Sequence, residues 1–340
     1  MIRNLFTSNF RVLTIPLCVV AVFLLVEVIF RLVYFGPAAV IHPLKYNPFT
    51  MQRSALFIYS DDPGIGKRLA PNRKTIFKGA RFTTNEFGYR ERAVTLKKPV
   101  DTFRLAVLGR SFSMGFGVDD DEVYSRRLEL LLNDYRSEKY QVLNFAVGGY
   151  NLNQSSLSYE KHVRQFDPDM IILPIYPGEI ESMLPIKYNR PPVFSWLNFR
   201  RAYLRAFFTY EMYRKWYKKN INVVTPRGVY KAPKKKRRPT VNAEEVLFEF
   251  LERRRAEGVP VVIVVLPKIE KVYDKQKVLK IKEVSDTREG VHFINVYELL
   301  GRKLDRSETI YPGDHHPNAG VHQLYAEHIF SGLKEILPAD

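Results

Sequence analysis

The sequence contains almost no cysteine, with a single one, Cys18, in 340 residues. One cysteine excludes a disulfide framework within the chain. It fits a reducing compartment and a bacterial periplasm about equally well, so cysteine usage assigns no compartment. The composition also differs from that of a disordered protein, because 46% of the residues are hydrophobic. The length is sufficient for one large domain or two small ones.

Charged residues are almost absent from residues 12–35, which read VLTIPLCVVAVFLLVEVIFRLVYF with only Glu27 and Arg31 charged. About 20 apolar residues are enough to cross a bilayer as a helix. Glu27 and Arg31 are one helical turn apart and can pair on one face. A small-residue cleavage site after this segment is also missing. We therefore expect a retained membrane anchor rather than a cleaved signal peptide or a buried core helix.

The orientation of this anchor is predicted from the cations that flank it. Arg3, Arg11 and the terminal amine precede the segment, and Arg31 and Lys45 are the nearest cations at its far end. This excess favours an N-terminus inside the cytoplasm. We expect a single-pass protein of the inner (cytoplasmic) membrane whose C-terminal domain is periplasmic.

Positive charge is abundant, with a formal net charge of +17, and much of it lies in residues 214–238. A basic run of this kind is usually a solvated loop. Its other interpretation is contact with anionic lipid or an acidic polysaccharide. Because no zinc-ligand spacing, recognition helix or aromatic RNA-binding motif accompanies it, we expect no nucleic-acid partner.

We assign the anchor to residues 1–36. Two segments of different composition follow it. Residues 37–100 are rich in proline, glycine and aromatics, and we predict a linker and a lead-in subdomain of short strands and turns. Residues 101–340 alternate short, buried-looking strands with amphipathic helices, which predicts a doubly wound α/β/α sandwich with a mostly parallel five-stranded sheet. A basic and aromatic stretch at about 185–240 interrupts this alternation as an insertion. The predicted strands are 103–109, 140–147, 170–176, 259–267 and 291–296, and the predicted helices are 123–132, 243–254 and 321–337.

Polar residues capable of acyl-transfer chemistry follow these strands. Ser111 comes after the first strand, and Asp314 and His316 precede the last helix. A serine at a strand-to-helix turn can use a helix N-terminus and nearby backbone N–H groups to stabilise an oxyanion, while a histidine removes its proton and an aspartate orients the imidazole. Each signal alone is weak, since a serine after a strand is more often an N-cap. Their joint placement at the carboxyl ends of one sheet favours a catalytic site.

The order of these segments resembles the SGNH (GDSL-like) hydrolase family over about residues 55–335. The lead-in also resembles a membrane-anchored branch associated with cell-surface polysaccharide modification. The segments that carry the resemblance are Asp62-Pro63, Gly66, Leu69, Pro71-Asn72, Thr84-Asn85, Gly88-Tyr89-Arg90, 103–109, 142–147 with Gly149-Tyr150, and Asp314 with His316-Pro317-Asn318, His322 and Ala326-Glu327.

The resemblance implies a role for each matched residue. Ser111 would be the nucleophile, His316 the base and Asp314 its partner, and the backbone N–H groups of Ser111 and Gly149 would donate to the oxyanion. It implies a serine-dependent acyl-ester hydrolase or O-acyltransferase that acts on cell-envelope polysaccharide, with no metal and no organic cofactor. The transfer reaction would also require an acyl donor or a membrane partner that delivers the acyl group.

The sequence departs from the family pattern at two positions. Arg110 stands where the family has aspartate before the nucleophile, and Gly178 stands where it has the asparagine that donates to the oxyanion. Losing one such donor typically lowers the rate on the order of 100–1000-fold. Asn151 or Asn153 could substitute, and Arg110 could bind a carboxylated sugar or form a structural ion pair. The alternative is a catalytically degraded domain that binds or supports a membrane assembly.

Three further patterns have weaker interpretations. Asp314 and the nearby histidines could bind a metal, but His322 and His328 are six residues apart on one predicted helix and do not share a face. Residues 64–67, Gly-Ile-Gly-Lys, lack the first glycine and the Ser/Thr of a phosphate-binding loop. Residues 115–117, Gly-Phe-Gly, predict a turn. The preference for His316 over His315 as the base comes from the family match alone.

Overall fold

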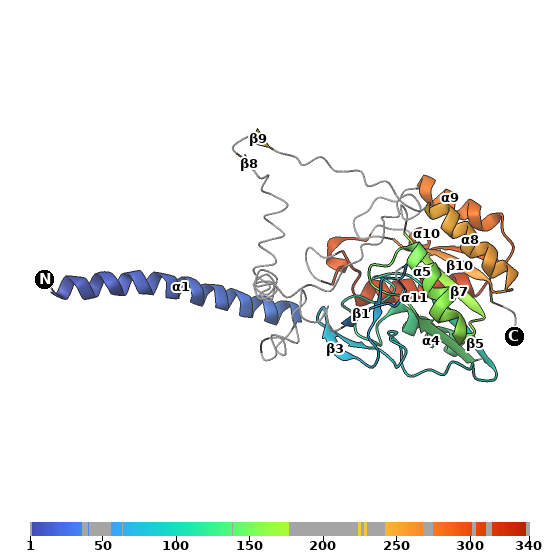
Figure 1. The fold of residues 1–340 in the computed structure, drawn as a ribbon, viewed down its shortest axis with the longest axis horizontal. Helices are drawn as coiled ribbons and strands as arrows, with labels where there is room; N and C mark the ends of the chain where they lie inside the picture. Colours follow the sequence, from blue (N-terminus) through green and yellow to red (C-terminus); the bar gives the residue numbers. More distant parts are fainter. Residues whose placement is uncertain are drawn as a thin grey trace. The chain divides into compact units, whose positions relative to one another are not determined.

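The computed structural model describes residues 2–35, 40, 56–62, 64–137, 139–176, 224–225, 228–229, 242–267, 275–300, 304–310 and 315–337. The chain divides into two compact units (Figure 1). The first comprises residues 1–53, 77–79 and 191–235, and the second comprises residues 54–76, 80–190 and 236–340. Of the predicted insertion at 185–240, the described part is two short antiparallel strands, β8 (Val224–Thr225) and β9 (Gly228–Val229). The predicted domain boundaries stay predictions.

A single long helix, α1 (Ile2–Phe35), contains the apolar N-terminal segment. Its stretch Thr14–Val33 has 20 residues and is apolar enough to cross a membrane, because 20 residues at 1.5 Å each give about 30 Å. Large apolar side chains such as Leu17 and Val33 are exposed, which a core helix would not allow. Arg31 Nε donates to Glu27 Oε1 at 2.8 Å, as the spacing predicted. By length and composition α1 is a membrane span or a signal sequence.

The predicted parallel sheet is confirmed. Five strands pair in the order β11-β10-β7-β5-β6, and every pairing is parallel. Numbered in chain order, the strands have the arrangement 2-1-3-4-5 of doubly wound proteins. In this arrangement the second strand is added on one side of the first, and the third to fifth strands are added on the other side, so the strand order reverses between the first and third strands. Here that switch point lies between β5 and β7. The strands are β5 (Thr102–Val107), β6 (Lys139–Asn144), β7 (Met170–Ile175), β10 (Val261–Val265) and β11 (Val291–Asn295).

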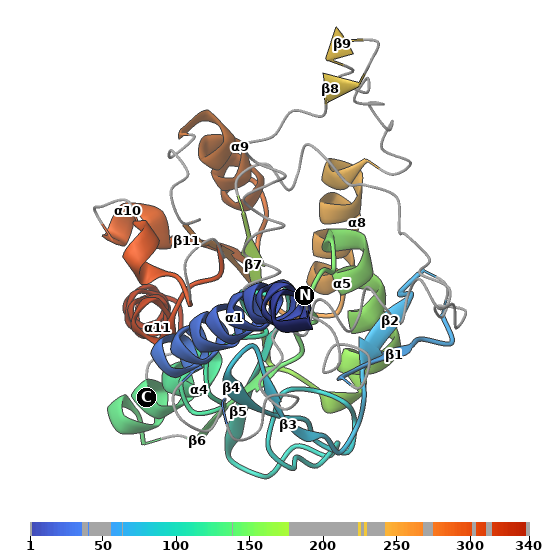
Figure 2. The same ribbon diagram turned by 90° about the vertical axis from the view of Figure 1, so that its left-hand side faces the viewer.

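Helices cover both faces of this sheet, which explains why its strands are apolar on both sides (Figure 2). Leu105 and Val107 of β5 belong to a core cluster with α4 and α11, whereas Ala106 and Leu108 belong to a second cluster with α8 and α9. The helices are α4 (Tyr124–Tyr135), α5 (Leu152–Ser158), α8 (Ala243–Ala256), α9 (Lys275–Asp286), α10 (Val296–Leu300) and α11 (Ala319–Leu333). Short turns of π or 3-10 helix are Tyr159–Val163, Arg164–Phe166 and Arg306–Glu308.

Strand β6 lies at one edge of the sheet, and side chains bind its outward N–H groups. The Tyr140 N–H donates to Asn133 Oδ1 at 2.9 Å, and the Val142 N–H donates to Glu129 Oε2 at 2.9 Å. The Asn144 N–H donates to Glu91 Oε2 at 3.3 Å. Alternate amides along this edge are therefore hydrogen-bonded without a further strand.

The lead-in segment forms short strands and turns, as predicted. Strands β1 (Phe57–Tyr59) and β2 (Lys67–Leu69) pair antiparallel, and β3 (Lys74–Phe77) pairs with β4 (Ala80–Thr83). The turns that follow, residues 84–92, include a buried asparagine whose side chain organises the backbone. Asn85 Oδ1 accepts from the N–H groups of Phe87 and Tyr89 at 3.1 and 3.0 Å.

Candidate active site

Ser111 lies in the loop that follows β5, the strand at the switch point. Gly109, with φ +127°, allows the chain to leave the strand sharply, and a Cβ there would lie 2.8 Å from Ser113 Oγ. Residues 111–117 form consecutive turns, and the Phe116 N–H donates to the Ser111 carbonyl at 3.1 Å. Ser111 therefore lies in a run of turns and not at the first residue of a helix, and the helix predicted at 123–132 is present as α4. The next helix, α4, begins only at Tyr124, because the intervening glycines have positive φ.

His316 reaches Ser111 from the segment that precedes α11. Its carbonyl accepts from the Ile310 N–H at 3.1 Å, and the neighbouring Pro317 forms an antiparallel bridge with Thr309. His316 Nε2 lies 2.9 Å from Ser111 Oγ, a hydrogen-bond distance. His315 is exposed. The structure therefore brings the predicted nucleophile and the predicted base together, and it selects His316 over its neighbour.

Aromatic rings hold the imidazole of His316 in place. Phe116 stacks on it with ring centroids 4.4 Å apart, and Phe112 meets it edge-on at 5.2 Å. Phe112 in turn packs edge-on against Tyr176 at the end of β7, at 4.9 Å. A base clamped between rings has few alternative rotamers, so Nε2 stays directed at Ser111.

Several predicted site residues lie outside the described residues. They are Asp314, the predicted partner of His316, and Gly178, where the family has its asparagine. The observed geometry is therefore the close pair of Ser111 and His316, and the catalytic roles of these two residues and of Asp314 stay predictions.

The two predicted oxyanion donors are backbone amides of different loops. Gly149 follows β6, has φ +85° and is exposed. Among the described residues, the Ser111 and Gly149 N–H groups donate to no other atom. Both amides are therefore available to an oxyanion.

The two predicted substitute donors have other positions. Asn151 caps α5: its Oδ1 accepts from the Gln154 N–H at 2.9 Å, and Gln154 Oε1 accepts from the Asn151 N–H at 3.1 Å. This capping box fixes the side chain of Asn151. Asn153 lies within α5 and shows no contact with Ser111 in the part of the chain that the structure describes. Neither residue is placed as a direct replacement for the family's asparagine.

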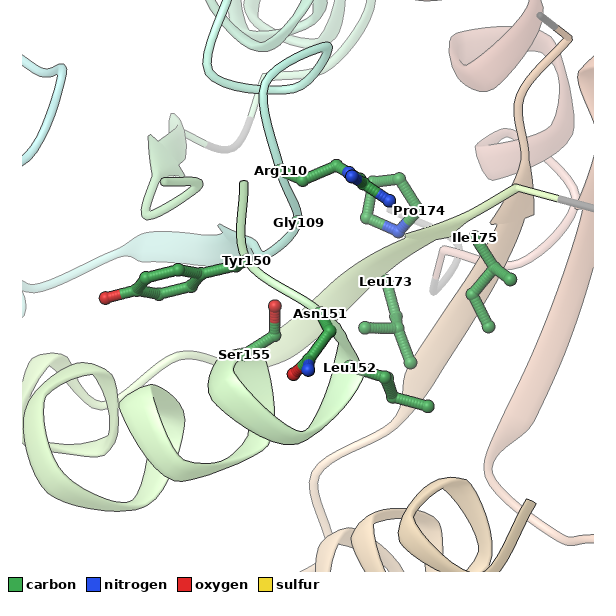
Figure 3. Close-up of a pocket in the computed structure, with 9 residues that line it drawn as sticks. All are labelled: Gly109, Arg110, Tyr150, Asn151, Leu152, Ser155, Leu173, Pro174 and Ile175. Atoms are coloured by element: carbon green, nitrogen blue, oxygen red, sulfur yellow. The ribbon is translucent and has the colours of Figure 1, made fainter. Parts of the chain in front are cut away.

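A small pocket at the carboxyl ends of the strands includes Gly109 and Arg110, the two residues before Ser111 (Figure 3). Its lining combines the start of the Ser111 loop, the end of β7 and the start of α5, and it includes neither Ser111 nor His316. In open α/β sheets this is the position where ligands bind. Arg110, the departure from the family pattern, lines it beside Pro174. The lining residues are Gly109, Arg110, Tyr150, Asn151, Leu152, Ser155, Leu173, Pro174 and Ile175.

A buried arginine of the lead-in, which the sequence did not identify as functional, secures the Ser111 loop. Arg90 donates to the carbonyls of Met114 at 3.0 Å and Val118 at 2.6 Å, and also to the Gly115 carbonyl. Its Nε pairs with Asp120 at 3.0 Å. Burial lowers the pKa of its guanidinium. The Gly88-Tyr89-Arg90 motif was the available signal, but its meaning depends on contacts with residues 24 or more positions away.

His322 is a buried neutral histidine and not a metal ligand in this structure. It is 0% exposed, its Nδ1 accepts from the Tyr124 N–H at 3.2 Å, and its ring stacks on that of Tyr124. Burial lowers its pKa to about 3. Within the described ranges no three histidine, cysteine or acidic side chains are grouped so that they could hold a metal ion.

Comparison with known proteins gives similarities to solved structures alone. No protein-family model and no curated protein matches the chain. TesA is 15% identical, with 69% of this chain and 99% of that chain covered and a TM-score of 0.42. A GDSL-like lipase from Bacteroides thetaiotaomicron is 10% identical, with 69% and 89% covered and a TM-score of 0.38. A catalytic mutant of Axe2, an acetylxylan esterase from Geobacillus stearothermophilus, is 12% identical, with 68% and 94% covered and a TM-score of 0.41.

At these identities and scores the solved structures assign neither an activity nor a substrate to this chain. The fold follows from the chain's own sheet and loops. A five-stranded parallel sheet carries a serine after its first strand, and a histidine before its last helix reaches that serine. The chain therefore has the doubly wound α/β fold that its sequence predicted, and Ser111 and His316 meet where the SGNH-like motifs placed them.

Proposed function

We propose that this protein is a serine-dependent acyl-ester hydrolase or O-acyltransferase. The observation that carries the proposal is the 2.9 Å contact between His316 Nε2 and Ser111 Oγ. A serine hydroxyl is a weak nucleophile unless a base accepts its proton, and this contact places the base within reach. The free amides of Ser111 and Gly149 add the oxyanion donors that acyl transfer needs.

The reaction follows from these positions. Ser111 Oγ attacks the ester carbonyl while His316 accepts its proton, and the carbonyl electrons move to the oxygen as a tetrahedral intermediate forms. The intermediate collapses, the alcohol leaves with the proton from His316, and the acyl group stays on Ser111. His316 then deprotonates either water, giving hydrolysis, or a sugar hydroxyl, giving transfer.

The acyl group and the acceptor form the finer part of the proposal. Phe112, Phe116 and Tyr176 crowd the surroundings of His316, which supports a small acyl group such as acetyl. A membrane-spanning α1 and a net charge of +17 support an anionic polysaccharide or lipid surface of the cell envelope as the setting. The transfer reaction would require a membrane partner that delivers the acyl group.

A second candidate function belongs to another class. Arg110 and Gly178, at positions where the family has aspartate and asparagine, support a catalytically degraded domain that binds or supports a membrane assembly. Such a component should co-purify with its partners in fixed stoichiometry even when Ser111 is replaced. An enzyme would lose its function with Ser111→Ala, whether or not it has partners.

The deciding experiment measures hydrolysis of 4-nitrophenyl acetate by the full chain in detergent. We expect turnover by the native protein and at least a 1000-fold loss in Ser111→Ala and His316→Asn, since removing a triad member typically costs that much or more. His315→Asn is the matched control and should keep its activity, because His315 is exposed beside the same site. A native protein that neither turns over nor reacts with a serine-directed phosphonate would contradict the enzyme proposal.

The periplasmic location has its own test. A reporter that is active only outside the cytoplasm, fused after Asp340, should be active. An inactive reporter would contradict the envelope-polysaccharide substrate, while leaving the esterase chemistry of Ser111 and His316 to the first experiment.

A further inference from the structure

The hairpin of β1 and β2 brings a lysine to the predicted oxyanion glycine. A Cβ built on Gly149 would lie 3.1 Å from Nζ of Lys67 and 4.0 Å from its Cε. Lys67 is the first residue of β2, 82 positions before Gly149 in the sequence. It is also the lysine of the Gly-Ile-Gly-Lys segment, residues 64–67. That segment is not a phosphate-binding loop, because it lacks the first glycine and the Ser/Thr of that motif.

Two hydrogen bonds hold this hairpin against the loop and helix that follow β6. The Tyr150 hydroxyl donates to the Lys67 carbonyl at 2.6 Å. Gln154 Nε2 donates to the Ile65 carbonyl at 2.7 Å. Both bonds join residues 83 or more positions apart, and both fix the backbone from which the Lys67 side chain extends. The position of Lys67 is therefore built into the fold.

An aromatic ring also contacts the ammonium of Lys67. The ammonium lies over the ring of Phe57, 4.8 Å from the ring centroid, at a distance where a cation and an aromatic ring attract each other. Lys67 is half-buried, so its charge is less screened by water than a fully exposed one. Three features thus restrict the ammonium to the neighbourhood of Gly149: the docked backbone, the ring and the partial burial.

We propose that the Lys67 ammonium acts as the third oxyanion donor of this site. This proposal rests on the proposed function, in which the amides of Ser111 and Gly149 are the first two donors. The family's third donor is an asparagine whose position here is Gly178, a residue without a side chain to donate. An ammonium has three N–H donors and a full positive charge, so it can take over the role of an amide side chain.

The chemical step needs no further reactant. As the Ser111 Oγ–carbon bond forms, the carbonyl π electrons move to the oxygen and the serine proton moves to His316. Negative charge thus develops on the oxygen beside the amide of Gly149. Lys67 keeps its proton throughout and stabilises that charge by a charge-assisted hydrogen bond. When the intermediate collapses, the electrons return and the ammonium is unchanged.

A lysine in this position could instead bind an anionic group of the substrate, and the two roles separate kinetically. An oxyanion donor acts on every substrate, including a neutral one, and lowers kcat when it is removed. A substrate anchor acts on anionic substrates, and its removal raises KM for those alone. A neutral ester therefore tests the oxyanion role without interference from substrate charge.

The experiment compares the native full chain, Lys67→Met and Lys67→Arg in hydrolysis of 4-nitrophenyl acetate. We expect kcat of Lys67→Met to fall about 100-fold with KM within about threefold, the loss typical of one missing oxyanion donor. Lys67→Arg, which keeps the charge and N–H donors, should recover part of that loss. Phosphonylation of Ser111, whose adduct also carries a tetrahedral oxyanion-like centre, should slow in Lys67→Met as well.

Lys161→Met is the matched control, because Lys161 pairs with Asp62 of the same hairpin and its side chain is 52% exposed. It removes the same charge from the same region, and its kcat should stay within about twofold of native. The thermal midpoint of each variant shows that the fold is intact. An active native protein with an unchanged kcat in Lys67→Met, or with a change in KM for anionic esters alone, would overturn the role of Lys67. An inactive native protein would instead contradict the proposed function itself.

Discussion

The two loops that carry the proposed oxyanion donors are held in different ways. The loop after β5, with Ser111, is secured by the buried guanidinium of Arg90, which donates to several of its carbonyls. The loop after β6, with Gly149, is secured by neutral groups, the Tyr150 hydroxyl and the capping box of α5. The guanidinium makes the charged contacts of the first loop, to which Asn144 Nδ2 adds a hydrogen bond to the Ser113 carbonyl at 2.8 Å, whereas the second loop is held by neutral hydrogen bonds. Removing Arg90 should therefore cost more stability than removing any one hydrogen bond of the second loop.

Both loops nevertheless depend on the same segment of sequence. Arg90 and the β1-β2 hairpin belong to residues 56–92, which precede the sheet in the chain. The lead-in thus shapes the site rather than merely connecting it to α1. Residues 56–92 therefore hold both loops, one through Arg90 and the other through the β1-β2 hairpin.

The largest effect is expected from Arg90→Met. It leaves the buried carbonyls of Met114, Gly115 and Val118 without this donor, and a buried acceptor left unpaired costs about 1–3 kcal/mol. The lost ion pair with Asp120 adds less, because the Asp120 side chain is 35% exposed. Activity should fall as well, because Phe116, which stacks on His316, lies in the released loop. Chemical denaturation measures the loss. Arg90→Lys is a smaller change and should keep part of the stability. It provides the measurement if Arg90→Met does not fold.

The control for this variant is Arg81→Lys. Arg81 pairs with Asp119 and Asp121 next to Asp120, but its side chain is 63% exposed. An exposed ion pair contributes little to stability, because water screens it. Equal losses in Arg81→Lys and Arg90→Met would contradict the central role of the buried guanidinium.

Glu91 sharpens the comparison, because it binds the end of β6 just before the second loop. Burial, mainly, raises the pKa of its carboxyl to about 7, and Glu129 adds to this. Between pH 4.5 and 7 the folded protein holds a proton that the unfolded chain releases, so the stability is greatest below pH 4.5 and falls as the pH rises through 7. Glu91→Gln should remove this dependence. It should stabilise the protein by about 1–3 kcal/mol at pH 8 and change little at pH 5.

Thermal unfolding at pH 5 and at pH 8 is the measurement for Glu91→Gln. The exposed neighbour Glu86 provides the control, since Glu86→Gln should alter neither value. A native protein whose stability rises between pH 5 and 8, relative to Glu91→Gln, would show that the carboxylate form is the favoured one.

Gly149→Ala tests the second loop directly. The left-handed backbone at φ +85° costs a residue with a Cβ about 1–2 kcal/mol, and the new methyl would lie 3.1 Å from Lys67 Nζ. Gly258→Ala has the same kind of backbone, φ +70°, with nothing within 4 Å of the new Cβ. Both should destabilise the fold similarly in a denaturation curve. Hydrolytic activity should fall in Gly149→Ala alone. An equal fall in Gly258→Ala would show that Gly149 has no specific role in the activity.

Tyr150→Phe is expected to have the smallest effect. It removes one hydrogen bond to the Lys67 carbonyl, worth about 0.5–1.5 kcal/mol, and leaves the bond from Gln154 to Ile65 in place. Tyr135→Phe, at a tyrosine that is 53% exposed, should change the unfolding free energy less. If Tyr150→Phe were as damaging as Arg90→Met, the second loop would depend on one contact, and the contrast between the loops would disappear.

The sequence predicted the sheet because its strands are buried on both faces. Runs such as Val261–Val265 are apolar at every position, and no helical period competes with them. The close approach of Ser111 and His316 could be predicted because the motifs that resemble the family mark both residues. The turn at 115–117 was also predicted correctly, and the structure gives its two glycines φ of +76° and +78°.

The parts of the site that the sequence did not predict depend on contacts between distant segments. Lys67 and Gly149 are 82 positions apart, and no local pattern relates them. Asn151 was considered as an oxyanion donor, but its spacing from Gln154 fits a capping box, which the structure shows. The charged sequence of α9 (Lys275–Asp286), with few apolar residues, hid a helix whose packing residues are Val278 and Ile281.

The side-chain acceptors along β6 have a consequence for association between molecules. An open edge strand presents unpaired N–H groups on which a strand of another chain can add, which leads to aggregation. Here Asn133, Glu129 and Glu91 already occupy the N–H groups of Tyr140, Val142 and Asn144. An incoming strand would have to displace two carboxyl groups and an amide oxygen to begin pairing. This edge of the sheet is therefore closed to intermolecular β-pairing by side chains rather than by a further strand.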